Sequence, residues 1–267
     1  MTRTEWADLP SAVRHAIEAR TGPVADAATA DKGVMSPFAS VLHTARGPVF
    51  AKGTPDAGQS WMYRAEAEVT RTAPLAPALL WQVDAGGWIV AGYEFISGRH
   101  PDLSPGSADI PALVDALRVM SGAPWPEAVR KKPLPARWGN LLPEGYADDL
   151  AGRSLAHTDM SPLNMLATPQ GIRLVDWALA CPAPAWADTA FTVPRLILAG
   201  HTPGQAEEIA RQVPAFANAP ETAVSVFVRT LRAVWEAREA ADPLPHRAPL
   251  SAAVRSWAES RMARPGR

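Results

Sequence analysis

Two short stretches of this chain carry its most informative residues: LAHTDMSPLNML at 155–166 and GIRLVDWALA at 171–180. The first places Asp159 and Asn164 on either side of a proline that prevents a regular helix. The second ends an apolar run at Asp176. The residues between Asn164 and Asp176 predict two short strands joined by a turn. Because paired strands lie about 5 Å apart, this hairpin should return Asp176 to the neighbourhood of Asn164.

These three polar side chains divide into metal ligands and a group that can handle a proton. The carboxamide of Asn164 and the carboxylate of Asp176 are hard oxygen ligands. A small, incomplete set of such ligands suits Mg²⁺ that also binds substrate phosphates. Asp159 is left to orient or deprotonate a hydroxyl group. We therefore predict Asn164 and Asp176 as metal ligands and Asp159 as the catalytic residue.

The pattern of His157, Asp159, Asn164, strand, turn, strand and Asp176 resembles the aminoglycoside phosphotransferase and choline kinase family, which are protein-kinase-like small-molecule kinases. Thr158 stands where that family usually has glycine, and the tryptophan after Asp176 fits its pattern. His157 looks catalytic by its position, but we expect it to pack and hydrogen-bond so that it supports the catalytic loop. A protein kinase is the weaker alternative, because the chain has no H-R-D, D-F-G or A-P-E segment.

The resemblance extends into the N-terminal part of the chain and covers about residues 23–200. It implies a phosphate-binding lysine on a strand, and VFAKG supplies Lys52. The preceding loop, GVMSPFAS, places Ser36 among the nucleotide-binding residues. A glutamate on the following helix should hold the lysine, and RAEAEV offers Glu66 or Glu68. We prefer Glu66 by comparison with the family pattern and leave Glu68 as the alternative.

Two further segments receive roles from the same resemblance. GYEFISGR resembles the hinge that binds adenine, with Glu94 and Ile96 as the backbone contacts. APAWADTAF resembles the segment whose aspartate supports the catalytic loop through backbone N–H groups, which gives Asp188 that structural role.

The sequence pattern predicts an α+β, bilobal protein-kinase-like fold. Residues 1–96 should form a nucleotide-binding lobe with an antiparallel sheet and one helix inserted in it. Two hairpins are expected in the sheet, one with its turn at 45–47 and one with its turn at 84–87. A helix capped by Asp8 and ending at Gly22 should precede the sheet. Residues 97–267 should form a larger, mostly helical lobe with the catalytic loop and the acceptor site. In that lobe we expect helices over 111–121, 143–152, 187–200, 204–213, 220–240 and 250–263.

Composition narrows the class of protein. The chain has 267 residues, 47% of them hydrophobic, and a net charge of -1, which gives no reason to expect a nucleic-acid or membrane partner. The single cysteine, Cys181, fits a reducing compartment and a buried apolar role. The N-terminal residues lack the apolar core of a signal peptide. We therefore expect a cytoplasmic protein.

The function these residues predict is transfer of the γ-phosphoryl group of ATP or GTP, with Mg²⁺, to a hydroxyl of a small molecule. The acceptor can be an antibiotic, as in aminoglycoside resistance, or a metabolite such as a sugar, nucleoside or amino alcohol. A non-catalytic nucleotide-binding pseudokinase and a metal-dependent hydrolase are the alternatives. Five acidic residues are candidates for binding a cationic acceptor: Glu144, Asp148, Asp149, Glu236 and Glu239. Basic residues accompany them, namely Arg229, Arg232 and Arg238 on the same later helix and Arg255, Arg261, Arg264 and Arg267 toward the C-terminus. This mixture does not indicate a pocket for a polycation. The sequence leaves the acceptor, its reacting hydroxyl and the oligomeric state open.

Overall fold

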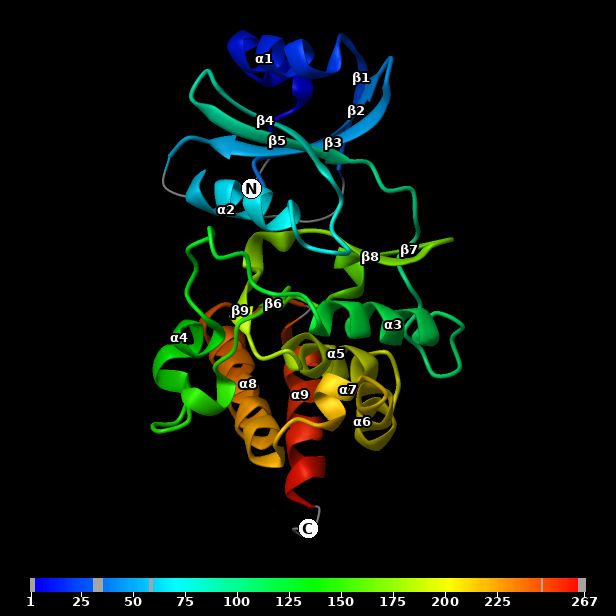
Figure 1. The fold of residues 1–267 in the computed structure, drawn as a ribbon, viewed down its shortest axis with the longest axis vertical. Helices are drawn as coiled ribbons and strands as arrows, with labels where there is room; N and C mark the ends of the chain where they lie inside the picture. The colour runs from blue at the N-terminus through cyan, green and yellow to red at the C-terminus, as the bar shows by residue number, and fades with distance from the viewer. Residues whose placement is uncertain (1–2, 31–35, 58–59, 246, 264–267) are drawn as a thin grey trace. The chain divides into compact units, whose positions relative to one another are not determined.

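The computed structural model describes residues 3–30, 36–57, 60–245 and 247–263 (Figure 1). The chain divides into two compact units, Met1–Ser97 with Asp176–Ala178, and Gly98–Val175 with Leu179–Arg267. Asp176 therefore groups with the N-terminal part of the chain, whereas the residues on either side of its short segment belong to the second unit.

The first unit is built on a five-stranded antiparallel sheet in the order β1-β2-β3-β5-β4. Its strands are β1 (Val24–Thr29), β2 (Phe38–Thr44), β3 (Gly47–Pro55), β4 (Leu79–Ala85) and β5 (Trp88–Glu94). Gly86 and Gly87 join β4 to β5 with φ of 56° and 75°, a conformation that glycine adopts without strain. Both hairpins expected from the sequence, β2–β3 and β4–β5, are present.

The edge strand β1 is the part of this sheet that the sequence does not predict. Its residues, VADAAT, are mostly alanine and aspartate, which disfavour strands. β1 pairs only with β2, from Val24 opposite Thr44 to Thr29 opposite Ser40. Pairing with the neighbouring strand therefore outweighs a weak local preference.

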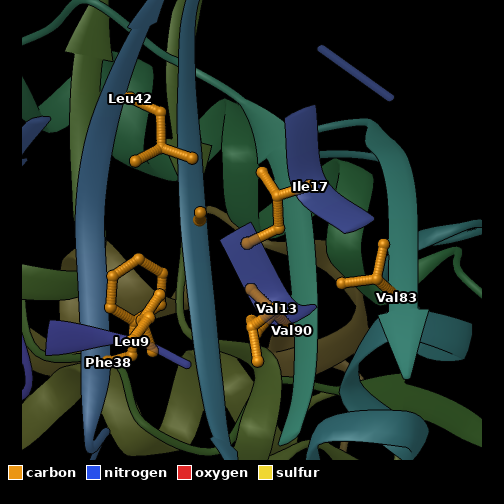
Figure 2. Close-up of a cluster of buried hydrophobic side chains, with 8 residues drawn as sticks. Leu9, Val13, Ile17, Phe38, Leu42, Val83 and Val90 are labelled. Carbon is orange, nitrogen blue, oxygen red and sulfur yellow. The ribbon is translucent and has the colours of Figure 1, made fainter. Parts of the chain in front are cut away.

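Helix α1 (Ser11–Thr21) covers one face of the sheet (Figure 1). Val13 and Ile17, four residues apart, lie on one side of the helix and are fully buried. They pack with Leu9 against strand residues that include Phe38, Leu42, Val83 and Val90 (Figure 2). Burying one such side chain contributes about 1.5–3 kcal/mol. The helix begins at Ser11, directly after Pro10, and no side chain caps it, so the expected Asp8 cap is wrong. It ends at Gly22 as expected.

Helix α2 (Ser60–Thr70) lies on the opposite face of the sheet (Figure 1). Ala67 of α2 packs with Ala91 and Tyr93 of β5, whereas Val90 points to the α1 side. This alternation follows from the two-residue period of a strand. α2 is the helix that the sequence places inside the sheet.

The second unit is mostly helical, as expected. Its helices are α3 (Ile110–Ser121), α4 (Leu134–Trp138), α5 (Ala187–Leu198), α6 (Pro203–Arg211), α7 (Pro214–Ala217), α8 (Glu221–Ala241) and α9 (Arg247–Met262). Edge-on contacts between Phe227 and three other aromatic side chains, Trp138, Trp186 and Phe191, join α4, α5 and α8. Across the described ranges, no helix combines the length and the apolar character that crossing a membrane requires.

The helix expected over 143–152 is wrong. The segment contains only a short 3-10 turn, η3 (Asp148–Leu150). Pro143 precedes Gly145, which has φ of 84°, a value outside the helical region. The backbone at Gly145 therefore prevents a regular helix from starting at this segment.

Two small antiparallel ladders flank the candidate catalytic loop of the second unit. The predicted hairpin is β7 (Met165–Thr168) with β8 (Gly171–Leu174). The second ladder, β6 (Ser154–Ala156) with β9 (Cys181–Ala183), was not predicted, because each strand has only three residues. β6 ends directly before His157, so this ladder fixes where the candidate catalytic loop begins.

Candidate functional site

A buried lysine forms the centre of the candidate site in the first unit. Lys52 lies on the central strand β3, opposite Ala39 and Ala91 of its neighbours. Its Nζ is 3.1 Å from Oε1 and 3.0 Å from Oε2 of Glu66, and 2.7 Å from Oδ1 of Asp176. Glu66 is buried, and Lys52 is 8% exposed. The ammonium group thus lies between two carboxylates.

Electrostatics keep this lysine charged. Burial alone would lower the pKa of Lys52, but the carboxylates of Glu66 and Asp176 outweigh burial and hold that pKa above its usual value. The ring of Tyr63 lies beneath the ammonium, with its centroid 5.7 Å from Nζ. Lys52 therefore presents a fixed positive charge at physiological pH.

The structure distinguishes the two candidate glutamates on α2. Glu66 contacts Lys52, and its Oε1 also accepts a hydrogen bond from the backbone N–H of Trp177 at 3.0 Å. Glu68 forms an exposed ion pair with Arg71, at 3.1 Å. The two residues are two positions apart and so point to different sides of the helix.

Asp176 has a backbone conformation that is uncommon for a residue with a side chain. Its φ is 64°, in the left-handed region, which aspartate tolerates better than most residues. The Asp176 side chain is 46% exposed, whereas Trp177 is fully buried. Burial of Trp177 and its bond to Glu66 fix the short Asp176–Ala178 segment in the first unit.

Ser36 is buried, and its hydroxyl is hydrogen-bonded to the phenol of Tyr63. Burial raises the pKa of Tyr63, and the bond from Ser36 partly opposes that rise. The rest of the predicted phosphate-covering loop before Ser36, residues 31–35, lies outside the described residues.

The two predicted hinge residues differ in their backbone hydrogen bonds. The N–H of Glu94 donates to the carbonyl of Ala78 at 2.8 Å, so any adenine contact by Glu94 would use its carbonyl. Ile96 follows β5, and in the described part of the chain its backbone N–H and carbonyl have no partner. Ile96 can therefore offer both groups to a ligand.

In the second unit, a buried aspartate organises the candidate catalytic loop. Asp188, in the first turn of α5, accepts hydrogen bonds from the backbone N–H groups of His157 at 2.8 Å and Thr158 at 2.9 Å. Burial raises the pKa of Asp188, against the opposing effects of His157 and these hydrogen bonds. The carboxylate thus holds two consecutive peptide groups of the loop.

His157 is fully buried and makes two ring contacts. Its Nδ1 accepts a hydrogen bond from the backbone N–H of Asp159 at 3.3 Å, and its Nε2 is 2.9 Å from the carbonyl of Val175. Because Nδ1 accepts, Nε2 must carry the hydrogen and donate it to Val175. His157 therefore links the loop to the residue before Asp176.

Thr158 adopts a strained backbone conformation, with φ of 67°. A β-branched residue is a genuine outlier in this region. Its hydroxyl donates to the carbonyl of Leu179 at 2.8 Å. The guanidinium of Arg137, on α4, donates to the same carbonyl at 2.7 Å and lies 3.2 Å from the Thr158 hydroxyl. These bonds hold the loop in spite of the strain.

Asp159 follows Thr158 with a side chain that is 34% exposed. Its Oδ1 lies 3.3 Å from Nη2 of Arg195, on α5. Asn164 donates from Nδ2 to the backbone carbonyl of Asp159 at 3.2 Å, and its own backbone carbonyl accepts from Val175 at 2.9 Å. The carboxylate of Asp159 is thus held by the guanidinium of Arg195, and the side chain of Asp159 stays partly exposed.

The donor atoms fit a magnesium ion in their chemistry. Within the described ranges, no group of three or more His, Cys, Asp or Glu side chains forms a metal cluster. The Nδ2 bond of Asn164 leaves its carboxamide oxygen without a partner in the described part of the chain. That oxygen, in the second unit, and the exposed Asp176 carboxylate, in the first, are each hard ligands of the kind that Mg²⁺ prefers.

Three contributing residues were missed from the sequence: Tyr63, Arg137 and Arg195. Arg195 is seven residues after Asp188 on α5, which is two helical turns, so both side chains reach the same loop. That spacing was readable once Asp188 had been assigned. Arg137 carried no such signal, because it comes from a helix distant in sequence.

Comparison with known proteins identifies the fold. No protein-family model matches this chain, and no curated protein matches its sequence. An aminoglycoside phosphotransferase from Alicyclobacillus acidocaldarius matches with a TM-score of 0.57 and 18% identity, over 95% of this chain and 94% of the other. A thermostable mutant of the aminoglycoside phosphotransferase APH(4)-Ia matches with a TM-score of 0.62 and 15% identity, over 92% and 99%. A choline/ethanolamine kinase family protein from Mesorhizobium loti matches with a TM-score of 0.54 and 16% identity, over 95% and 94%.

The chain therefore has the fold of the small-molecule kinases of the aminoglycoside phosphotransferase and choline kinase type. This confirms the resemblance on which the predicted α+β kinase-like fold rests. A variant of APH(4)-Ia has been solved with ADP and hygromycin B, and spectinomycin phosphotransferase, which also matches, with ADP and spectinomycin.

Proposed function

We propose that this chain is an ATP-dependent phosphotransferase that moves the γ-phosphoryl group of a nucleotide to a hydroxyl of a small molecule. The observation that carries the proposal is the buried Lys52, whose ammonium group bridges the carboxylates of Glu66 and Asp176. Buried ion pairs seldom add net stability compared with apolar residues. A strand lysine held by a helix glutamate is what protein-kinase-like enzymes use to bind phosphates.

The first unit would hold the nucleotide. Lys52 would bind the α- and β-phosphates, and Glu66 would keep its ammonium in place. The carbonyl of Glu94 and the backbone N–H of Ile96 would bind adenine or guanine. Ser36 would support the phosphate-covering loop through its bond to Tyr63.

Asn164 and Asp176 would hold Mg²⁺ through their side-chain oxygens. When bound, the ion supplies positive charge that neutralises the phosphate oxygens during transfer. Asp176 would keep its position through Lys52 and the buried Trp177. Asn164 would keep its position through the backbone of the candidate catalytic loop.

Asp159 would act on the acceptor. Its carboxylate would orient the acceptor hydroxyl and accept its proton late in the transfer. His157 and Asp188 would hold the loop backbone, and Arg195 would fix the carboxylate. Positioning and electrostatic stabilisation carry most of the catalysis in such a reaction.

The acceptor is either an antibiotic or a metabolite with a hydroxyl group. A non-catalytic nucleotide-binding pseudokinase is disfavoured because the chain retains Lys52, Asp159, Asn164 and Asp176 together. A metal-dependent hydrolase would have no need of the buried Lys52.

A transfer screen tests the proposal. The protein is incubated with γ-labelled ATP, Mg²⁺ and a panel of hydroxylated antibiotics and metabolites, and labelled products are separated. We expect transfer to at least one acceptor, loss of transfer on chelation of Mg²⁺, and recovery when Mg²⁺ is restored. Asp176→Ala should abolish transfer under saturating ATP, because it removes a metal ligand.

Asp84→Ala is the matched control, since Asp84 is an exposed carboxylate of the same unit in an ion pair with Arg64. It should retain transfer. Wild-type turnover in Asp176→Ala would contradict the metal assignment. Nucleotide binding without transfer to any acceptor would favour the pseudokinase.

A further inference from the structure

The side chains around Asp159 are basic. Arg195 contacts its carboxylate directly, at 3.3 Å, and is only 17% exposed. Arg137 contacts the preceding residue, Thr158, at 3.2 Å. Guanidinium groups from two helices therefore contact the candidate catalytic loop, that of Arg195 (α5) at Asp159 and that of Arg137 (α4) at Thr158.

Two further arginines belong to the same neighbourhood. Burial lowers the pKa of Arg238, on α8, and repulsion from Arg137 and Arg247 lowers it further, while Asp159 opposes the change. Arg247 donates to the backbone carbonyl of Arg238 at 3.1 Å. Arg137, Arg195, Arg238 and Arg247, which we call the arginine group, come from four helices of the second unit, α4, α5, α8 and α9.

Few carboxylates offset this charge. Asp159 pairs with Arg195, and Asp242 pairs with Arg247 at 3.1 Å. Asp188, which accepts hydrogen bonds from the backbone of His157 and Thr158, is a third carboxylate of this neighbourhood. The four arginines therefore exceed these three carboxylates by one positive charge. Arg238 keeps its guanidinium over the ring of Trp235, at 5.3 Å, and in the described ranges it forms no ion pair.

In the described part of the chain, none of the five acidic candidates for binding a cationic acceptor forms an ion pair with the arginine group. Glu236 is occupied by Arg232 at 2.8 Å and Arg255 at 3.4 Å. In the part of the chain that the structure describes, no ion pair involves the other four candidates, Glu144, Asp148, Asp149 and Glu239. A polycation that reached Asp159 would face like charges, which are destabilising when brought together.

We infer that the acceptor is a hydroxylated small molecule that carries a carboxylate or phosphate group, which the arginine group binds while Asp159 engages the hydroxyl. This rests on the proposed phosphotransfer at Asp159. Arginine suits the role because its planar guanidinium matches carboxylate and phosphate oxygens in a two-pronged contact. A hydroxy acid or a sugar phosphate has this chemistry, and an aminoglycoside does not.

Calorimetry with matched ligand pairs tests the inference. Saturating AMP-PNP and Mg²⁺ fill the nucleotide site, so that added anions report on the acceptor site alone. The pairs are ribose 5-phosphate with ribose and gluconate with glucose, and spectinomycin is the cationic probe. At least one anionic member should bind about tenfold or more tightly than its neutral partner, as expected for hydrogen bonds to a charged group.

Substitutions at Arg238 locate that binding. Arg238→Gln should remove most of the preference for the anionic ligand, and Arg238→Glu should turn it toward spectinomycin. Arg232→Gln is the matched control, because Arg232 lies on the same helix but is paired with Glu236. It should keep the wild-type preference. Thermal unfolding checks that each variant is folded. If Arg238→Gln does not fold, Arg195→Lys is tested in its place.

The outcomes separate the inference from the proposed function. Equal or tighter binding of the neutral and cationic ligands, or an unchanged preference in both Arg238 variants, would overturn the inference. Phosphoryl transfer to neutral or cationic acceptors alone would also overturn it and leave the proposed function intact. Anion binding that depends on Arg238, without transfer to any acceptor, would retain the anion site and contradict phosphotransfer.

Discussion

At the scale of single residues, backbone strain is concentrated next to the proposed chemistry. The non-glycine residues with positive φ in the described ranges are Thr158 and Asp176. Thr158 directly precedes Asp159, which is proposed to act on the acceptor, and Asp176 is a proposed metal ligand. Strain of this kind persists only where the surroundings hold the residue in place. For Thr158 these are the bonds to Asp188, Leu179 and Arg137.

A series at Thr158 separates strain from hydrogen bonding. Thr158→Gly removes a left-handed penalty of about 1–2 kcal/mol and a hydrogen bond worth about 0.5–1.5 kcal/mol, so the two effects should nearly cancel. Thr158→Val keeps the strain and loses the bond, and should lower the free energy of unfolding by about 1–3 kcal/mol. Urea denaturation measures both. A valine variant that is as stable as the glycine variant would contradict this explanation, with Thr158→Ser as the hydroxyl-retaining control.

At the scale of elements, the α2 helix places one glutamate inside the site and another on the surface. Glu66 contacts Lys52 and Trp177, whereas Glu68 pairs with Arg71 in solvent. One helix therefore offers a matched pair of variants that differ in burial and not in chemistry.

Glu66→Gln should lower the free energy of unfolding by about 2–3 kcal/mol. This is less than the about 3–5 kcal/mol typical of breaking a buried pair, because Asp176 still neutralises Lys52. Glu68→Gln should change it by less than about 0.5 kcal/mol, as for other exposed ion pairs. Chemical denaturation of the two variants checks this. Equal effects at the two positions would show that the Lys52–Glu66 pair contributes nothing specific.

The elements also show how far sequence patterns reach. Hairpins with clear turn residues and helices with regular apolar spacing were predicted, as at Gly86-Gly87 and in α1. β1 and the β6–β9 ladder were not, because their formation depends on pairing with strands far along the chain. The helix expected over 143–152 is absent because Gly145 has a positive φ, which the sequence pattern does not indicate.

The candidate site also combines features that local sequence predicts with features that depend on distant parts of the chain. Spacing in the sequence predicts a site in the loop around Asp159, and family resemblance suggests Lys52 and Glu66 as further members. The basic surroundings of Asp159 could not be predicted, because Arg137, Arg195 and Arg238 come from three helices that only tertiary packing brings together. Charge counted along the sequence therefore said little about the acceptor.

At the scale of the whole molecule, the fold is shared with small-molecule kinases at identities of 18% and below. Low identity leaves room for a different acceptor, since the fold hosts the chemistry and local side chains choose the substrate. The central claim is consequently about Asp159, where the proposed chemistry and the proposed acceptor specificity meet.

The most direct measurement compares wild type with Asp159→Asn, which keeps the shape of the side chain and removes its charge. Nucleotide affinity is measured by calorimetry, and acceptor phosphorylation by mass spectrometry with the acceptor found in the screen. Asp115→Asn is the control, because Asp115 is an exposed aspartate of the same unit in an ion pair with Arg118. We predict unchanged nucleotide affinity in both variants and a turnover in Asp159→Asn lower by a factor of about 10²–10⁴, the usual contribution of a positioned general base. Equal turnover in Asp159→Asn and wild type would contradict the proposed mechanism.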